Sequence, residues 1–412
     1  PVRRAYLHGE VGVALEGLGG VASGGPNAMD SASLLADTGE DLRRFPEGIV
    51  SETQLAWHWE KAGLAEKAAH YHMLAGRRAI YFSFSFDDML SHYVQALHLL
   101  STLPDNPRRT HWEQVGYQTL GVLLAKTKGW MIPEVGQAFR KSLELAEQIG
   151  EGPLLAEALT WMAYFHRSGG ELETALELGR RAVQLAQSGP PEWAMSQQRE
   201  LARTLQLHGD FGASARLLGP HAEALLRAGS LLLRDSTNHV AYNPWDNLLQ
   251  LAYLPWTLWA QGYPDRALAV SKTTLEIVLR ERDQLSGDAE AVAIMNALCP
   301  THQLRREVEG VEEDLKVLLP LMEEHRCSPF MLPLATLYPG WLQAQRGHLE
   351  QGIGMLRRGL AEWSQAWVMW QPLWKGYLAG ALARAGRVDE GLVVLEEALE
   401  QAERTGERWN EA

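Results

Sequence analysis

The hydrophobic positions along the chain recur in pairs of helical segments separated by a short polar turn. Between 338 and 398 the sequence reads YPGWLQAQRGHLEQGIGMLRRGL and, after a connector, GYLAGALARAGRVDEGLVVLEEAL. In each copy an apolar helix ends at a glycine, and five residues later a small residue starts the inward face of a second helix. Gly347 precedes Gly352, and Gly386 precedes Gly391. Because a small residue lets two helix axes cross closely, the pattern predicts tandem helical hairpins.

The same template recurs upstream. Its copies are Gly63 with Ala68, Gly170 with Ala175, Gly209 with Ser214 and Gly262 with Ala267, and looser copies are Trp130 with Val135 and Arg306 with Val311. From the third unit on, the second-helix positions are 135, 175, 214, 267, 311, 352 and 391, with gaps of 40, 39, 53, 44, 41 and 39 residues. Repeats of this length exceed the roughly 34 residues of a tight tetratricopeptide repeat. We predict an all-α, right-handed superhelical α-solenoid of tetratricopeptide-like hairpins, with about eight or nine units of roughly 40 residues.

The apolar stripes also set the expected helix limits. The predicted helices of the repeats before position 338 are 53–63, 64–79, 80–103, 112–128, 133–149, 153–167, 172–187, 193–207, 211–228, 248–261, 264–282, 288–304 and 308–325. Before them, Arg3–Leu18 predicts an amphipathic helix, and the Gly- and Ser-rich residues that follow predict a long loop with one short turn near Ser31–Ala36.

The chain is therefore expected to have two parts, residues 1–50 as a link to an upstream module and residues 51–412 as the solenoid. The gap of 53 residues locates an irregular insertion at 230–247, and insertions in solenoids often lie on the binding face. Because the chain begins without Met and stops after an uncapped amphipathic helix, we expect it to be a piece of a longer protein.

Composition narrows the possible partners. The chain is 46% hydrophobic and 22% charged, which is typical of a folded protein, and its net charge is −13. An acidic chain is a poor match for nucleic acid or an anionic membrane surface. Two cysteines, Cys299 and Cys327, supply neither a disulfide framework nor a zinc site. No apolar run is long enough for a membrane span. We expect a cytoplasmic protein with no cofactor, no nucleic-acid partner and no membrane contact.

Several segments resemble a known family. They are QLAWHWEKAGLAEKAAHYHMLAGRRA at Gln54–Ala79, LPWTLWAQGYPDRAL at Leu254–Leu268, HQLRREVEGV at His302–Val311, GWLQAQRGHLEQGI at Gly340–Ile353 and the C-terminal LARAGRVDEGLVVLEEALEQAERTGERW. The chain resembles the tetratricopeptide-like C-terminal sensor region of bacterial STAND-type signal-transduction ATPases. Some of these carry an adenylate or guanylate cyclase domain, and others are LuxR-type transcriptional regulators.

The resemblance implies a sensor that acts on an upstream nucleotide-binding switch domain of the same protein, while catalysis takes place elsewhere. The chain has no GxxxxGK[ST] phosphate loop, and no GxSxG or HExxH motif. His58, His70 and His72 are candidate metal ligands by residue type. However, His70 and His72 lie two residues apart on a helix and so point to different sides, which does not favour a metal site. We predict no metal ligands and no catalytic residues.

Aromatic residues recur eleven positions before the small residue of the second helix. By resemblance to tetratricopeptide repeats, that position lines a concave groove. Its occupants are Trp57, Leu124, Tyr164, Arg203, Trp256, Trp341 and Gly380. Trp259 follows Trp256 by three residues on the same helix face. Four of the seven occupants are aromatic in a chain that is 8% aromatic.

Two interpretations of these rings remain open, inter-repeat packing or a groove for a ligand. His302 with Arg305 adds a candidate anion site, against the alternative that the loop merely caps a helix. The Trp363, Trp367, Trp370 and Trp374 series predicts one helix face used for core packing. The candidate groove residues are thus Trp57, Tyr164, Arg203, Trp256, Trp259, His302, Arg305 and Trp341. The hypothesis is a non-catalytic sensor that binds a small-molecule or peptide effector, and the alternative is a protein-interaction scaffold with no small-molecule site.

Overall fold

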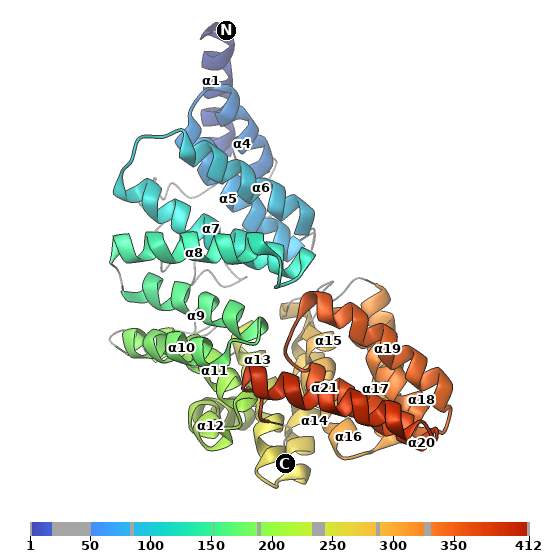
Figure 1. The fold of residues 1–412 in the computed structure, drawn as a ribbon. Helices are drawn as coiled ribbons and strands as arrows, with labels where there is room; N and C mark the ends of the chain where they lie inside the picture. Colours follow the sequence, from blue (N-terminus) through green and yellow to red (C-terminus); the bar gives the residue numbers. More distant parts are fainter. Residues whose placement is uncertain are drawn as a thin grey trace. The chain divides into compact units, whose positions relative to one another are not determined.

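The computed structural model describes residues 2–18, 51–82, 86–150, 152–187, 191–232, 244–285, 289–324 and 331–409, and these residues form helices joined by short turns (Figure 1). No strand occurs in the described ranges. The predicted all-α fold of repeated helical hairpins is therefore confirmed. The predicted turn at Ser31–Ala36, most of the insertion at 230–247 and Cys327 lie outside the described residues.

The chain divides into two compact units. Unit 1 comprises Pro1–Leu124 and Pro133–Ala158, and unit 2 comprises Ala125–Ile132 and Leu159–Ala412. The helices of unit 1 are α1 (Val2–Leu18), α4 (Glu52–Lys61), α5 (Ala65–Phe82), α6 (Phe86–Ser101), most of α7 (Pro107–Lys128), α8 (Pro133–Ile149) and the first turns of α9 (Gly152–Ser168).

A hydrophobic core within unit 1 joins α4, α5, α6 and α7. Ser51 begins α4 with a capping box, in which its hydroxyl accepts the Gln54 amide while the Gln54 side chain accepts the Ser51 amide. The indole of Trp59 is buried in this core. Gly12 of α1 lies against that indole, and a Cβ at Gly12 would come within 2.9 Å of it. The predicted helix Arg3–Leu18 is confirmed as α1, and it packs on the first hairpin.

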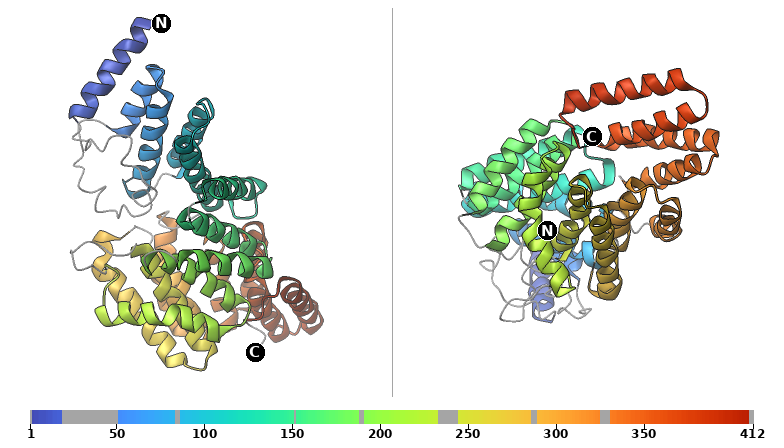
Figure 2. Two further views of the ribbon diagram at one scale, coloured as in Figure 1. Left: turned by 90° about the vertical axis from the view of Figure 1, so that its left-hand side faces the viewer. Right: turned by 90° about the horizontal axis from the view of Figure 1, so that it is seen from below.

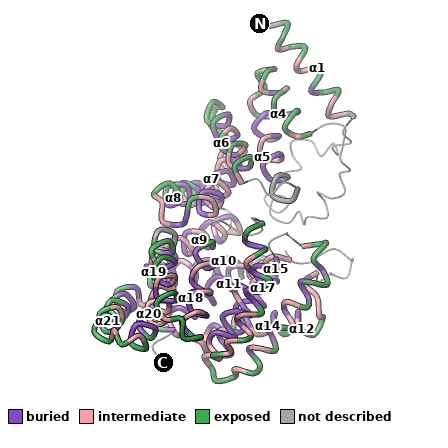
Figure 3. The backbone as a smooth tube through the Cα atoms, turned by 90° about the vertical axis from the view of Figure 1, so that its right-hand side faces the viewer, coloured by how far each residue is buried: buried purple, intermediate pink, exposed green. Residues whose placement is uncertain are grey.

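Unit 2 continues the hairpins to the end of the described chain, and Figure 2 shows the pairing of neighbouring helices from two further sides. Its helices are the rest of α9, α10 (Leu172–Ala186), α11 (Pro191–Leu207), α12 (Phe211–Ala228), α13 (Pro244–Ala260), α14 (Pro264–Glu281), α15 (Ala289–Ala293), α16 (Cys299–Leu304), α17 (Val308–Glu323), α18 (Leu334–Gln345), α19 (Leu349–Ala366), α20 (Gln371–Arg384) and α21 (Val388–Thr405). Buried residues follow the facing sides of these helices (Figure 3).

The turn glycines and small residues of the template have the predicted geometry. Gly170 and the turn glycines of the other close copies have positive φ, which a residue without Cβ adopts without strain. Arg306, which takes the glycine's place in a looser copy, also has a left-handed backbone with φ 59°. A Cβ on Gly352 would lie 2.7 Å from the amide nitrogen of Ala344. The small residues are therefore required by close helix crossing.

Two predicted helices are interrupted. The segment 288–304 contains a π-helical turn, Ile294–Leu298, between α15 and α16, in which the Cys299 amide donates to the Ile294 carbonyl. The tryptophan series 363–374 does not follow one helix face, because α19 ends at Ala366 and α20 begins at Gln371. Trp363, Trp367 and Trp374 are buried, as predicted for core residues. Trp370 is only partly buried and lies in the intervening turn with φ +72°.

Candidate functional site

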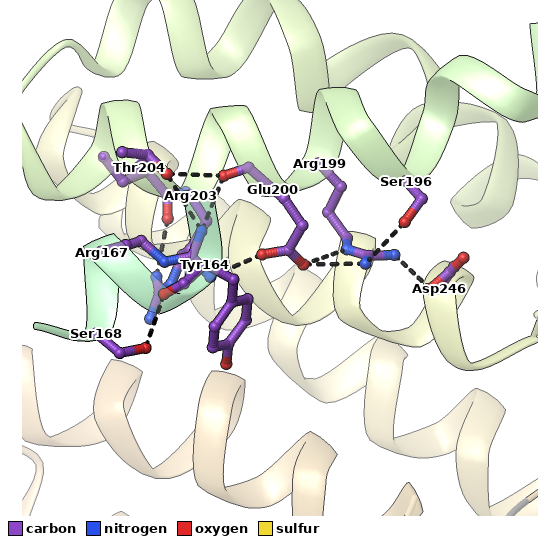
Figure 4. A network of polar contacts seen from close by, with 10 residues as sticks. Tyr164, Arg167, Ser168, Ser196, Arg199, Glu200, Arg203, Thr204 and Asp246 are labelled. Carbon is purple, nitrogen blue, oxygen red and sulfur yellow. Dashed lines mark hydrogen bonds and ion pairs between the residues drawn. The ribbon is translucent and has the colours of Figure 1, made fainter. Parts of the chain in front are cut away.

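Three of the eight predicted groove residues lie close together in unit 2. Tyr164 on α9, Arg203 on α11 and Trp256 on α13 occupy equivalent positions on the first helices of successive hairpins. The Arg203 guanidinium lies 5.3 Å from the Trp256 ring centroid, and Tyr164 is near enough to Arg203 to affect it electrostatically (Figure 4). The offset of eleven residues thus identified neighbouring positions on three consecutive repeats.

Arg203 is the centre of a group that we call the arginine cluster, consisting of Arg203, Tyr253, Trp256, Trp370 and Trp409. Its guanidinium lies 4.4 Å from the Tyr253 ring and 4.3 Å from the Trp370 ring. Such cation–π contacts stabilise a cation that has lost water. Burial lowers the pKa of Arg203 to about 10, so the side chain stays charged at neutral pH.

The hydrogen-bonding capacity of Arg203 is largely unused by the protein. A guanidinium carries five N–H donors. One Nη1 donor reaches the side-chain oxygen Oε1 of Gln206 at 2.8 Å, and among the described residues Arg203 forms no ion pair. Gln206 is itself held by its amide, which donates to the Tyr253 carbonyl and to the Thr257 hydroxyl. The cation is therefore positioned by its surroundings but not neutralised by a carboxylate in direct contact.

A buried ion network fixes the helices that carry this cluster. The Arg167 guanidinium of α9 binds Glu200 of α11 at 2.7 Å, and Arg199 binds the other Glu200 oxygen at 2.9 Å and Asp246 of α13 at 2.6 Å (Figure 4). Burial acts to raise the pKa of Glu200, but the charges of Arg167 and Arg199 outweigh it and hold that pKa below its usual value. Because three helices contribute, the network sets their relative register.

A second set of rings, which we call the tryptophan stack, adjoins Tyr164. Trp130 stacks on Tyr164 with a centroid distance of 4.1 Å, and Trp367 meets Tyr164 edge-on at 5.8 Å. Trp161 lies 6.0 Å from Tyr164, and the Arg167 guanidinium covers the Tyr164 ring at 4.2 Å. Burial raises the pKa of Tyr164 above its ordinary value, so its hydroxyl stays neutral.

The last repeat contacts these early helices of unit 2. The Val368 amide donates to the Ser168 carbonyl at 3.0 Å, and the Arg408 amide donates to the Leu207 carbonyl at 2.8 Å. Ser168 and Leu207 are the last residues of α9 and α11, where carbonyls lack partners within their own helix. The inner side of these hairpins is thus partly covered by two segments of the same chain, 367–370 and 406–409. The sequence-based interpretation of this position as the lining of a groove did not include these two segments.

Glu407 anchors the second of these segments. Its side chain is fully buried, and its carboxylate accepts the Trp409 indole N–H at 2.8 Å and the Trp370 amide at 3.1 Å. Burial raises the pKa of Glu407 to about 7, although the two hydrogen bonds and the charge of Arg203 act in the opposite direction. Glu407 and Arg203 are therefore near each other without a direct ion pair.

The other aromatic candidates do not join the cluster. Trp341 is 2% exposed and packs against Tyr377, because α20 covers that side of α18, so its predicted place in a groove is not observed. Trp259 packs against the core between α12 and α14. Trp57 belongs to unit 1, is half exposed and has the His8 ring at 4.9 Å.

The candidate anion site at His302 and Arg305 is filled by carboxylates of the protein. His302 is buried with its Nδ1 2.7 Å from an Asp314 oxygen, and Arg305 binds both Glu307 and Asp265. The histidine joins α16 to α17, and we correct its assignment from ligand binding to helix packing. In the described ranges, no group of three or more His, Cys, Asp or Glu is placed to bind a metal. Likewise, no described helix is long and apolar enough to cross a bilayer.

Sequence reasoning missed several members of the site. Trp370, Glu407 and Trp409 lie far along the chain from Arg203, and repeat spacing carries no information about such a distant contact. The ion network had a local signal, since Arg199, Glu200 and Arg203 lie within the apolar pattern of one helix. Charges at inward positions indicate a buried polar network.

Comparisons with known proteins identify the fold but no family. No protein-family model matches the sequence, and no curated protein matches it. Among solved structures, a Rap protein complexed with Competence and Sporulation Factor is similar, with 13% identity and a TM-score of 0.56 over 82% of this chain and 87% of that chain. This likeness shows a shared tetratricopeptide-like helical fold.

Two weaker neighbours are a Rap conjugation gene regulator of plasmid pLS20 in complex with the Phr* peptide and a STAND protein with a tetratricopeptide repeat sensor from Pyrococcus horikoshii. The first has 13% identity and a TM-score of 0.49, over 84% of this chain and 78% of that chain. The second has 14% identity and a TM-score of 0.46, over 85% of this chain. This chain spans about half (49%) of the length of that STAND protein.

Proposed function

We propose that the chain is a non-catalytic regulatory region of helical repeats that binds a peptide effector at the arginine cluster. The observation that carries this proposal is Arg203, a buried cation among aromatic rings that forms no ion pair among the described residues. Binding sites typically combine apolar and aromatic walls with a few fixed polar groups, and Arg and Trp dominate the energetics of recognition.

The position of the cluster also supports binding over simple packing. Tyr164 lies beside the cluster and Trp256 belongs to it, on the repeats before and after that of Arg203. Both keep part of their surface accessible, so an extended ligand could contact several hairpins at once. A Rap protein of similar fold has been solved in complex with Competence and Sporulation Factor, which supports a binding role for helical repeats of this kind.

The test is a selection of peptides from a display library against the intact chain, followed by calorimetry with the selected peptides. Arg203→Met should weaken binding roughly tenfold or more, because a hydrogen bond to a charged group contributes about 1.5–3 kcal/mol. Tyr263→Ala removes a ring that is 56% exposed and lies outside the cluster, so it serves as the matched control. The proposal is wrong if no peptide is selected, or if Arg203→Met binds the selected peptides as tightly as the wild type does.

The wider context that we propose is that of a cytoplasmic sensor in a signal-transduction ATPase, acting on a nucleotide-binding switch domain upstream. The resemblance of Gln54–Ala79 and of the repeats from Leu254 onward supports it. The reading frame before this segment provides the test, since a phosphate loop there is expected. A frame without a nucleotide-binding motif refutes this context and leaves peptide binding standing. An empty peptide screen together with capture of the switch domain indicates a protein-interaction scaffold.

A further inference from the structure

The segment 406–409 leaves the last helix and turns into the arginine cluster. Gly406 ends α21 with φ 74°, and the amides of Gly406 and Glu407 both donate to the Ala402 carbonyl. This left-handed turn is a common helix ending and reverses the chain direction. The turn brings the indole of Trp409 to 5.1 Å from the Trp256 ring and 4.7 Å from the Trp370 ring.

The segment contacts the site in the way a bound peptide would. The Arg408 amide donates to a carbonyl at the end of α11, while the Arg408 side chain is exposed. The two flanking side chains, Glu407 and Trp409, are buried in the cluster. A Cβ on Gly209 would lie 3.2 Å from the Arg408 Cβ, so the backbone of the segment passes close to the turn between α11 and α12. Alternate side chains thus enter the site while the one between them faces solvent.

The fit is incomplete in two respects. Glu407 binds the Trp370 amide and the Trp409 indole, and Arg203 binds Gln206, so the two buried charges do not form an ion pair with each other. Trp370 also adopts a left-handed backbone, which is unfavourable for a residue with a Cβ and persists only when its surroundings hold it. A ligand carboxylate in direct contact with Arg203 would make a stronger interaction than the one present.

We infer that the segment 406–409 is an internal ligand of the arginine cluster. The external effector is then a peptide that presents a carboxylate and an indole two residues apart, and this peptide displaces the segment. The inference rests on the proposed function and specifies its ligand class. A tethered segment has a high effective concentration, so the effector must compete with it. Effector binding releases Glu407 and Trp409, and the strained turn at Trp370 is then free to relax.

The first experiment uses a fluorescein-labelled peptide with the chain's own sequence ERTGERW, residues 403–409, and a scrambled peptide as control. In the double variant Glu407→Ala/Trp409→Ala the internal ligand is removed. This variant should bind ERTGERW at least roughly tenfold more tightly than the wild type does, and adding Arg203→Met should abolish the gain. Tyr263→Ala should bind like the wild type. Equal weak binding by a folded double variant, as judged by circular dichroism, overturns the inference.

A second measurement uses only the wild type, in case the double variant does not fold. Hydrogen–deuterium exchange is followed while a peptide selected from the display library is added. Faster exchange at the amides of Trp370 and Arg408, with protection of α9, α11 and α13, supports displacement. Protection of the same helices without faster exchange at those amides overturns the internal-ligand inference but leaves peptide binding intact. Failure to select any peptide contradicts the proposed function itself.

Discussion

Glu407→Gln isolates the cost of burying a carboxyl group in the arginine cluster. Glutamine has nearly the same shape, and its carbonyl oxygen can still accept the Trp409 indole and the Trp370 amide, but it does not ionise. Arg203 is the charged group that faces Glu407 from the neighbouring helix, and the adjacent Arg408 side chain points to solvent. The substitution therefore changes the ionisation of one buried group and little else.

The expected pH dependence follows from the direction of the pKa shift. The Glu407 carboxyl has a pKa of about 7 in the folded protein and an ordinary value of 4.5 when unfolded. Between these values the folded state binds more protons, so its stability falls as pH rises. The difference corresponds to about 3.5 kcal/mol, at about 1.4 kcal/mol for each pH unit. Roughly 1 kcal/mol is already lost at pH 5, which leaves about 2.5 kcal/mol to be lost by pH 8.

The assay is urea unfolding of the wild type and Glu407→Gln at both pH values, followed by circular dichroism. Other titrating groups contribute equally to both proteins, so the difference between the two isolates Glu407. The stability of Glu407→Gln relative to the wild type should rise by about 2.5 kcal/mol from pH 5 to pH 8. A stability difference between the two proteins that stays constant with pH would show that the Glu407 carboxyl group has no raised pKa in the folded protein.

Three further predictions concern stability. Glu200→Ala leaves two buried arginines without their shared carboxylate and should lower the free energy of unfolding by about 3–5 kcal/mol. As a control, Glu223→Ala breaks exposed ion pairs and should change the free energy of unfolding, measured in urea, by less than about 1 kcal/mol. Similar costs for the two would count against a buried network. Gly352→Ala places a Cβ 2.7 Å from the backbone of the preceding helix and should lower the melting temperature, while Gly376→Ala, with nothing within 4 Å of its Cβ, should gain about 0.5–1 kcal/mol. A tolerated Gly352→Ala would contradict the close crossing. Arg203→Met should keep or raise the melting temperature, since it replaces a buried cation by an apolar chain, and a large drop would mean that Arg203 serves the fold.

The repeat architecture could be predicted because the contacts within each hairpin join residues that are close in the sequence. A small residue five positions after the turn reflects a crossing between sequence neighbours, and the predicted limits of 133–149 and 211–228 are those of α8 and α12. The same logic found Tyr164, Arg203 and Trp256, since equivalent positions on stacked repeats are neighbours.

The closure of unit 2 could not be predicted from the same pattern. The bonds from Val368 to Ser168 and from Arg408 to Leu207 join backbone groups of distant repeats, and backbone groups carry no sequence signal. Repeat position alone also does not predict exposure. Trp341 occupies the same position in its repeat as Trp256, eleven residues before the small residue of the second helix, but α20 buries it. The π-turn at Ile294–Leu298 is another such case, and its Asn296 carbonyl accepts the Trp256 indole and orients that ring.

The decisive measurement is a crystal structure of the chain with a library-selected peptide. We expect a peptide carboxylate within hydrogen-bonding distance of the Arg203 guanidinium, a peptide ring against Trp256, and residues 406–409 out of the cluster. A peptide bound elsewhere, with Glu407 and Trp409 still in place beside Arg203, would contradict this expectation.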